Sequence, residues 1–97
     1  MKKYITNEQA ISILPEGEDV HTFINPGFGL VGADWGREEL IDKIQKSDIL
    51  ELTGEMARKM GHGLVIYNKT AKTQDDLLFI ETDEEKLVAL EKKLEEQ

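Results

Sequence analysis

The sequence predicts an α+β domain, in which helices pack on a mostly antiparallel sheet of about five strands. Five short runs rich in β-branched and aromatic residues alternate with segments whose apolar residues recur at helical spacing. Twice, two such runs follow one another without a helix between them, which is the pattern of antiparallel hairpins. A length of 97 residues, without a linker or an internal repeat, fits a single domain over residues 1–97. The expected order is α-β-β-α-β-α-β-β-α.

The first helix and the first hairpin have clear signals. Thr6 is the expected N-cap residue, and Gln9 three positions later completes a capping box. Pro15 ends the helix, whose apolar residues share one face: Ala10, Ile13 and Leu14. Strands are expected at residues 20–24 and 30–33, joined by a glycine- and proline-rich turn.

The second helix is expected to begin at Asp34 as the N-cap residue, with Trp35 in its first turn, and to end near Ser47. A strand at residues 49–52 follows. The buried face of this helix is expected to carry three residues: Leu40, Ile41 and Ile44.

A short helix beginning at Thr53 or Gly54 comes next, with Gly61 as a left-handed residue after its end. Two strands and the polar loop between them then follow, at residues 64–67, 77–80 and 68–76 respectively. Thr82 opens a second capping box, and the last helix has its apolar residues on one side: Leu87, Leu90 and Leu94.

Composition excludes several function classes. The chain has no cysteine, which rules out disulfides, cysteine-based zinc sites and a thiol nucleophile. No apolar run approaches the roughly 20 residues of a membrane helix, and no signal-peptide pattern follows the N-terminus. We therefore expect a cytoplasmic protein without a membrane partner, a metal site or a cofactor.

The net charge of −8 is concentrated near the C-terminus, where residues 75–97 carry nine acids against three lysines. Such a chain is expected to be repelled by nucleic acid. The acids of the last helix can be read as a solvated face that keeps the protein soluble. They can also be read as a mimic of a phosphate backbone that binds a basic groove of a partner, through Glu84, Glu85 and Glu91.

The densest polar cluster surrounds the short helix. Glu55 lies three residues before Arg58 and four before Lys59, so local ion pairs alone could explain these charges. His62 lies between two glycines, where a tight turn could present its ring. The functional reading makes Glu55, Arg58 and His62 part of a ligand site.

Three further residues are candidates for the same ligand site. His21 is either a satisfied strand histidine or a contact for an anionic or aromatic ligand. Trp35 and Arg37, at an expected helix start, either close the core or offer a stacking surface for a phosphate or nucleobase. No phosphate-binding glycine motif and no hydrolase motif is present, so no catalytic residue is predicted.

Three segments carry a resemblance to a known group of proteins: His21-Thr22-Phe23, Gly32-Ala33-Asp34-Trp35, and the run from Glu51 to Leu64 that reads ELTGEMARKMGHGL. With these, most of the chain resembles a family of short uncharacterised proteins of phages and mobile elements of Gram-positive bacteria. The resemblance implies a small acidic accessory protein that modulates its host. It assigns no reaction and no functional residue.

These observations predict a non-enzymatic binding protein that occupies a host protein, such as a component of a defence system in the manner of anti-CRISPR proteins. The alternative is a protein that binds or sequesters a small anionic ligand, such as a nucleotide signal. A small hydrolase is the third reading. The sequence leaves the formation of homo-oligomers open.

Overall fold

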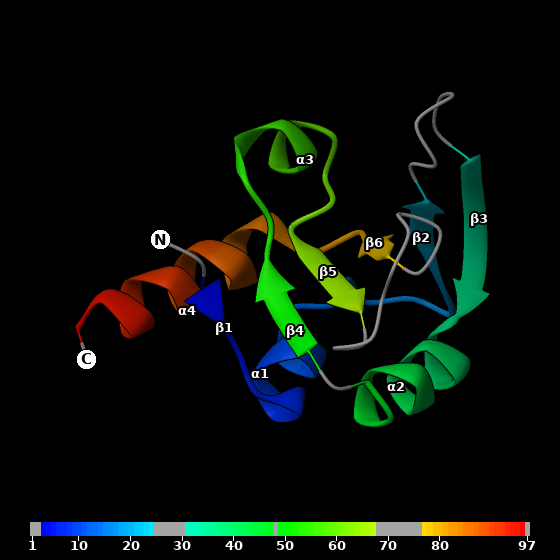
Figure 1. Cartoon of the computed structure of the whole chain (residues 1–97), viewed down its shortest axis with the longest axis horizontal. Coiled ribbons are helices and arrows are strands. Elements are labelled where there is room, and N and C mark those ends of the chain that lie inside the picture. The colour runs from blue at the N-terminus through cyan, green and yellow to red at the C-terminus, as the bar shows by residue number, and fades with distance from the viewer. Residues whose placement is uncertain (1–2, 25–30, 48, 68–76, 97) are drawn as a thin grey trace.

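The computed structural model describes residues 3–24, 31–47, 49–67 and 77–96, which form strands and helices in alternation (Figure 1). The strands are β1 (Lys3–Tyr4), β2 (Asp19–Ile24), β3 (Val31–Gly36), β4 (Ile49–Leu52), β5 (Leu64–Tyr67) and β6 (Leu78–Ile80). The helices are α1 (Asn7–Ser12), α2 (Arg37–Gln45), α3 (Glu55–Lys59) and α4 (Glu84–Glu95). The expected turn at residues 25–29 and the expected loop at residues 68–76 lie outside the described residues.

All the strands belong to one six-stranded sheet with the order β1-β4-β5-β6-β2-β3. Every neighbouring pair is antiparallel. The predicted α+β class and the predicted order of elements are confirmed, with β1 as an addition. β1 has only two residues and no apolar alternation, so the sequence pattern gives no signal for it.

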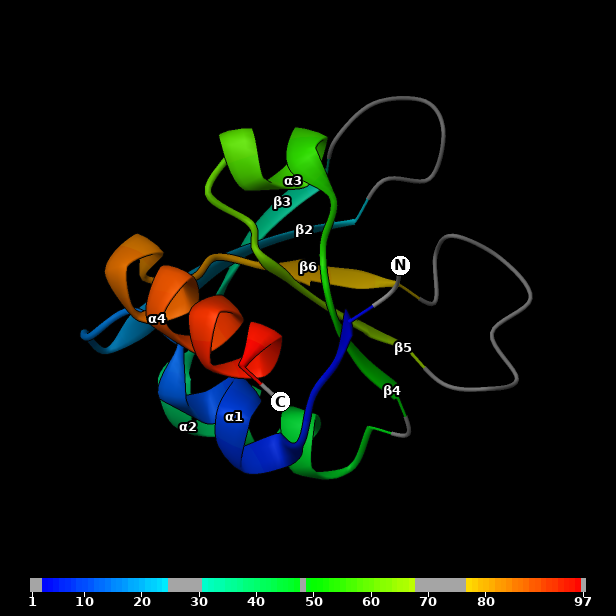
Figure 2. The ribbon, with the colours of Figure 1, turned by 90° about the vertical axis from the view of Figure 1, so that its left-hand side faces the viewer.

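The helices α1, α2 and α4 lie on one face of the sheet, whereas α3 lies beyond the ends of β4 and β5 (Figure 2). Alternate strand residues point to the covered face, as the period of two requires. The buried cluster there combines residues of β2, β4, β5 and β6 with residues of the three helices. α3 contributes no buried residue. The other face of the sheet therefore carries no helix in the described part of the chain.

Local signals for several helix ends are confirmed. Thr6 and Gln9 form the predicted capping box of α1, with reciprocal side-chain to backbone hydrogen bonds of 3.2 and 2.9 Å. Gly54 is the N-cap residue of α3, and Gly61 has a φ of 85° after its end. The apolar faces predicted for the first, second and last helices pack into the core.

Two predicted helix starts are wrong. Trp35 lies in β3 rather than in a helix, because β2 and β3 stay paired as far as Asp19 and Gly36, and Gly36 is the N-cap residue in place of Asp34. α4 begins one residue later than predicted. Its N-cap residue is Asp83, whose side chain accepts a hydrogen bond from the backbone of Lys86. Thr82 instead donates its backbone N–H to the carbonyl oxygen of Gly61, which ties α4 to the α3 segment.

Candidate functional site

A row of directly paired residues crosses the uncovered face of the sheet from one edge to the other. The register aligns six residues, one from each strand: Tyr4, Glu51, Val65, Phe79, Phe23 and Gly32. Three of these six are large apolar residues in the centre of the sheet: Val65 and Phe23, which are buried with 7% and 5% of their surface exposed, and the half-buried Phe79. The rings of Phe79 and Phe23 are stacked, with centroids 4.8 Å apart and an interplanar angle of 7°. The uncovered face is thus apolar at its centre.

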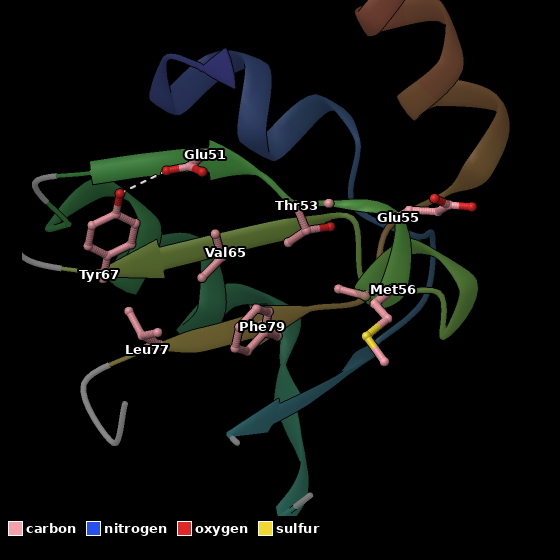
Figure 3. A pocket seen from close by; sticks show the side chains of 10 residues that line it. Glu51, Thr53, Glu55, Met56, Val65, Tyr67, Leu77 and Phe79 are labelled. Atoms are coloured by element: carbon pink, nitrogen blue, oxygen red, sulfur yellow. Dashed lines mark hydrogen bonds between the residues drawn. The ribbon is translucent and has the colours of Figure 1, made fainter. Parts of the chain in front are cut away.

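A groove of about 600 Å³ lies between this row and α3 (Figure 3). Tyr67 and Leu77 lie at one end, Val65 and Phe79 form the middle, and Met56 lies at the end next to α3. Its remaining lining residues are Glu51, Thr53, Gly54, Glu55 and Ala57. The side chain of Met56 is the most exposed of the large hydrophobic residues described, at 84%.

The polar groups of the groove are held by hydrogen bonds. The hydroxyl of Tyr67 donates to Oε2 of Glu51 over 2.8 Å, and the hydroxyl of Thr53 donates to the carbonyl oxygen of His62 over 2.7 Å. Burial raises the pKa of Tyr67, and the hydrogen bond to Glu51 raises it further. The tyrosine therefore keeps its proton at neutral pH and fixes one carboxylate oxygen of Glu51 at the groove.

His21 and His62 lie together next to the stacked phenylalanines. The His62 ring meets Phe23 edge-on at a centroid distance of 4.3 Å and His21 at 5.2 Å. Nδ1 of His21 lies 3.0 Å from Oδ1 of Asp34 on the neighbouring strand. Because a carboxylate only accepts, this contact places the ring proton of a neutral His21 on Nδ1.

His62 is buried, with 5% of its surface exposed, and neither ring nitrogen has a hydrogen-bond partner among the described residues. Burial lowers the pKa of His62, and the charge of a protonated His21 lowers it further. The Met60 carbonyl and the Glu81 carboxylate act in the opposite direction. The Met60 carbonyl oxygen favours a protonated His62 ring, although it accepts no hydrogen bond from that ring. At neutral pH His62 is thus an uncharged imidazole beside the aromatic centre of the uncovered face, and no described residue is hydrogen-bonded to its ring nitrogens.

The charges predicted to serve two different sites instead pair with one another. Arg58 on α3 contacts Glu84 over 3.3 Å and Glu91 over 2.6 Å, both on α4. Glu55 forms the expected ion pair with Lys59 over 3.6 Å. Glu85 is exposed in the first turn of α4. Arg58 therefore links α3 to α4 through two ion pairs.

Trp35 and Arg37 lie elsewhere, at the junction of β3 and α2. Trp35 packs against the helix-covered core, with Nζ of Lys43 5.5 Å from the ring centroid. Nε of Arg37 donates to the carbonyl oxygen of Pro15 over 3.4 Å. Within the described residues, no hydrogen bond, ion pair or ring contact joins Trp35 or Arg37 to Arg58 or His62. The structure brings His21 and His62 together, but it does not gather the six predicted ligand residues into one pocket.

The sequence interpretation missed the groove residues Glu51, Val65, Tyr67, Leu77 and Phe79. A signal for them exists in β5, where four consecutive residues are apolar or aromatic: Leu64, Val65, Ile66 and Tyr67. A strand whose outer face meets only water usually alternates apolar and polar residues. The continuous run therefore indicates that both faces of β5 contact something other than water.

Comparisons with known proteins add no family to these observations. The chain matches no protein-family model, and no similar curated protein or solved structure was found. Within the described ranges, no three His, Asp or Glu side chains are grouped so that they could hold a metal ion. Nor does any helix there combine the length and apolar composition that a membrane crossing requires.

Proposed function

We propose that this chain is a non-enzymatic binding protein that engages a target protein through the uncovered face of its sheet. The observation that carries the proposal is the apolar groove on that face, bordered by the highly exposed Met56. Binding sites are usually concave and lined mainly by apolar and aromatic side chains with a few polar groups, as this groove is. Methionine adapts its shape to a partner at little cost, which suits it to a contact surface.

The polar groups of the groove support binding rather than catalysis. The hydroxyls of Tyr67 and Thr53 both donate hydrogen bonds within the protein, to Glu51 and to the His62 carbonyl. A general base or nucleophile must instead reach the reacting atom of a substrate. These groups hold the shape of the groove, which is the requirement of a binding site.

The nature of the partner follows from the resemblance and from charge. The resemblance to phage and mobile-element proteins supports a host protein as the target, with a component of a defence system as one case. A net charge of −8 supports a target with a basic surface, since opposite charges accelerate encounter. Two of the predicted α4 contacts, Glu84 and Glu91, already pair with Arg58, so we place the contact on the uncovered face rather than on α4.

Small-ligand binding is a second candidate, because a groove of about 600 Å³ has the size of a small-molecule site. The acids at its border, Glu51 and Glu55, favour a neutral or cationic ligand over a nucleotide. A hydrolase is supported by no arrangement in the described residues.

Site-specific photocrosslinking in a Gram-positive host tests the main proposal. A benzophenone amino acid replaces Leu77 in the groove or, as the control, Val88, which is half-exposed on α4. We expect one or a few discrete host-protein adducts from position 77 and none from position 88. Adducts from position 88 alone would indicate that the partner binds α4 instead of the groove. The absence of adducts from both positions would argue against a protein partner.

A further inference from the structure

We propose that the groove receives the side chain of an arginine, carried by a short apolar segment of the partner. This inference rests on the proposed function and specifies its chemistry. In our proposal, the guanidinium group contacts Glu51, and the alkyl stem lies along Val65 and Phe79.

Glu51 is a carboxylate in an apolar setting. Its cross-strand neighbours on the uncovered face are Tyr4 and Val65, and its side chain is half-buried. No lysine or arginine in the described part of the chain forms an ion pair with it, and its hydrogen bond comes from the neutral Tyr67 hydroxyl. When a partner covers this face, the carboxylate loses water, which is costly unless a positive charge arrives with the partner. The groove therefore selects for a cationic group at this point.

The wall of the groove suits a flat cation better than a compact one. Phe79 and Phe23 are directly paired residues with parallel rings, so one face of the Phe79 ring rests on Phe23. Val65 pairs with Phe79 on the other neighbouring strand, and both residues line the groove. The alkyl stem of an arginine can lie along Val65 and Phe79 while its planar, weakly hydrated guanidinium group forms two parallel hydrogen bonds with a carboxylate, whereas an ammonium group is a strongly hydrated point charge. The geometry therefore favours arginine over lysine.

The charge at the border of the groove also favours a cationic ligand. Glu55 lines the groove at its α3 end, with 86% of its side chain exposed, and its partner Lys59 is 74% exposed. Screened surface pairs of this kind contribute little to stability and can be rearranged by a ligand. Met56, Val65 and Leu77 would contact the apolar residues that flank the arginine. An acidic segment of a partner would be repelled by the two carboxylates of the groove, and no lysine or arginine is among the described residues that line it.

Two matched peptides test the inference: acetylated and amidated heptapeptides with leucine and glycine around a central arginine or citrulline. Citrulline has the shape of arginine without its charge. Amide chemical shifts of the full-length protein are followed in NMR titrations of the wild type and of Glu51→Gln. Glu85→Gln on α4 is the control, because it removes the same charge away from the groove. The amide spectrum of each variant before titration reports its fold.

We expect the arginine peptide to shift the amides of β4, β5 and β6, and the citrulline peptide to bind at least tenfold more weakly. Glu51→Gln is expected to weaken arginine-peptide binding by a similar factor, whereas Glu85→Gln changes it less than twofold. Equal binding of both peptides would overturn the arginine proposal, as would the absence of groove shifts up to the solubility limit. Either result leaves the crosslinking at position 77 as an independent measure of the proposed function.

Discussion

The two faces of the sheet are built from the same strands but differ in what lies against them: three helices pack on one face, and the groove lies on the other. On the covered face, Leu64, Ile66 and Ile80 are almost completely buried under three helices. On the uncovered face, Val65 and Phe79 alternate with them along the same strands; Val65 is also buried, Phe79 is half-buried, and the exposed Met56 borders the groove. Burial under the helices stabilises the fold, whereas the proposal leaves the exposed apolar surface of the groove for a partner to cover. The proposal therefore assigns the covered face to folding and the groove to binding.

Leu77, just before β6, and Leu78, its first residue, give the largest expected contrast between the faces. Leu78 is buried in the helix-covered core, whereas Leu77 is half-buried and lines the groove. We expect Leu78→Ala to lower the free energy of unfolding by about 2–5 kcal/mol, because it leaves a cavity. Leu77→Ala removes the same atoms from a partly solvated position and is expected to cost about 1 kcal/mol. Urea unfolding followed by circular dichroism measures both.

Binding should show the reverse order. Leu77→Ala is expected to weaken the adducts or peptide shifts of the groove, whereas folded Leu78→Ala protein should keep them. If the two substitutions destabilise the protein equally, the uncovered face contributes to folding as much as the covered face, and the proposed division is wrong.

The glycines on either side of α3 give a smaller contrast. A Cβ atom on Gly63 would lie 2.5 Å from Cδ2 of Leu87 and 2.6 Å from Oγ1 of Thr82. A Cβ atom on Gly54 would meet no atom within 4 Å. We expect Gly63→Ala to cost about 1–3 kcal/mol through overpacking against α4, and Gly54→Ala to change stability by less than about 0.5 kcal/mol. Thermal unfolding of both variants checks this. Equal effects would mean that the α3 segment does not depend on its close approach to α4.

Much of the fold could be predicted because its signals are local. The capping box at Thr6 and Gln9 and the positive φ of Gly61 follow from nearest-neighbour chemistry. The start of α2 could not be predicted in the same way. Asp34 is a favourable N-cap residue, but the pairing of Trp35 with Val20 extends β3 and overrides that preference. Strand pairing is a tertiary effect that a single segment does not reveal.

The site was less predictable, for the same physical reason. Arg58 was a reasonable ligand residue on its own helix, and its engagement by Glu84 and Glu91 depends on how α3 and α4 meet in space. The groove residues come from three strands and one helix, and the sheet order that joins them is not encoded in any short motif. The sequence alone indicated His21 and His62 as candidates. The contacts of His62 with Phe23 and of His21 with Asp34 could not be predicted, because they depend on how the strands pair.

The smallest expected effect concerns His62, which packs against Phe23 on the uncovered face. Because burial lowers the pKa of His62, the folded protein takes up a proton on this ring at a lower pH than the unfolded chain does. Between pH 7.5 and the usual histidine value of about 6.5, both states are mostly neutral and stability changes little. As the pH falls below about 6.5, the unfolded chain binds more protons, so the free energy of unfolding declines. The decline levels off below the folded-state pKa.

His62→Leu is expected to remove this decline and to change the stability at pH 7.5 by less than about 1 kcal/mol, because no hydrogen bond of the ring with a described residue is lost. Urea unfolding of both proteins between about pH 7.5 and pH 5.5 measures the difference, above the range in which most carboxylates titrate. His21, Asp34 and Glu81 are present in both proteins, so the two proteins differ only at His62. A variant that retains the full pH dependence would show that His62 is not its source. A large loss of stability at pH 7.5 would show instead that the imidazole has a polar role in the folded protein.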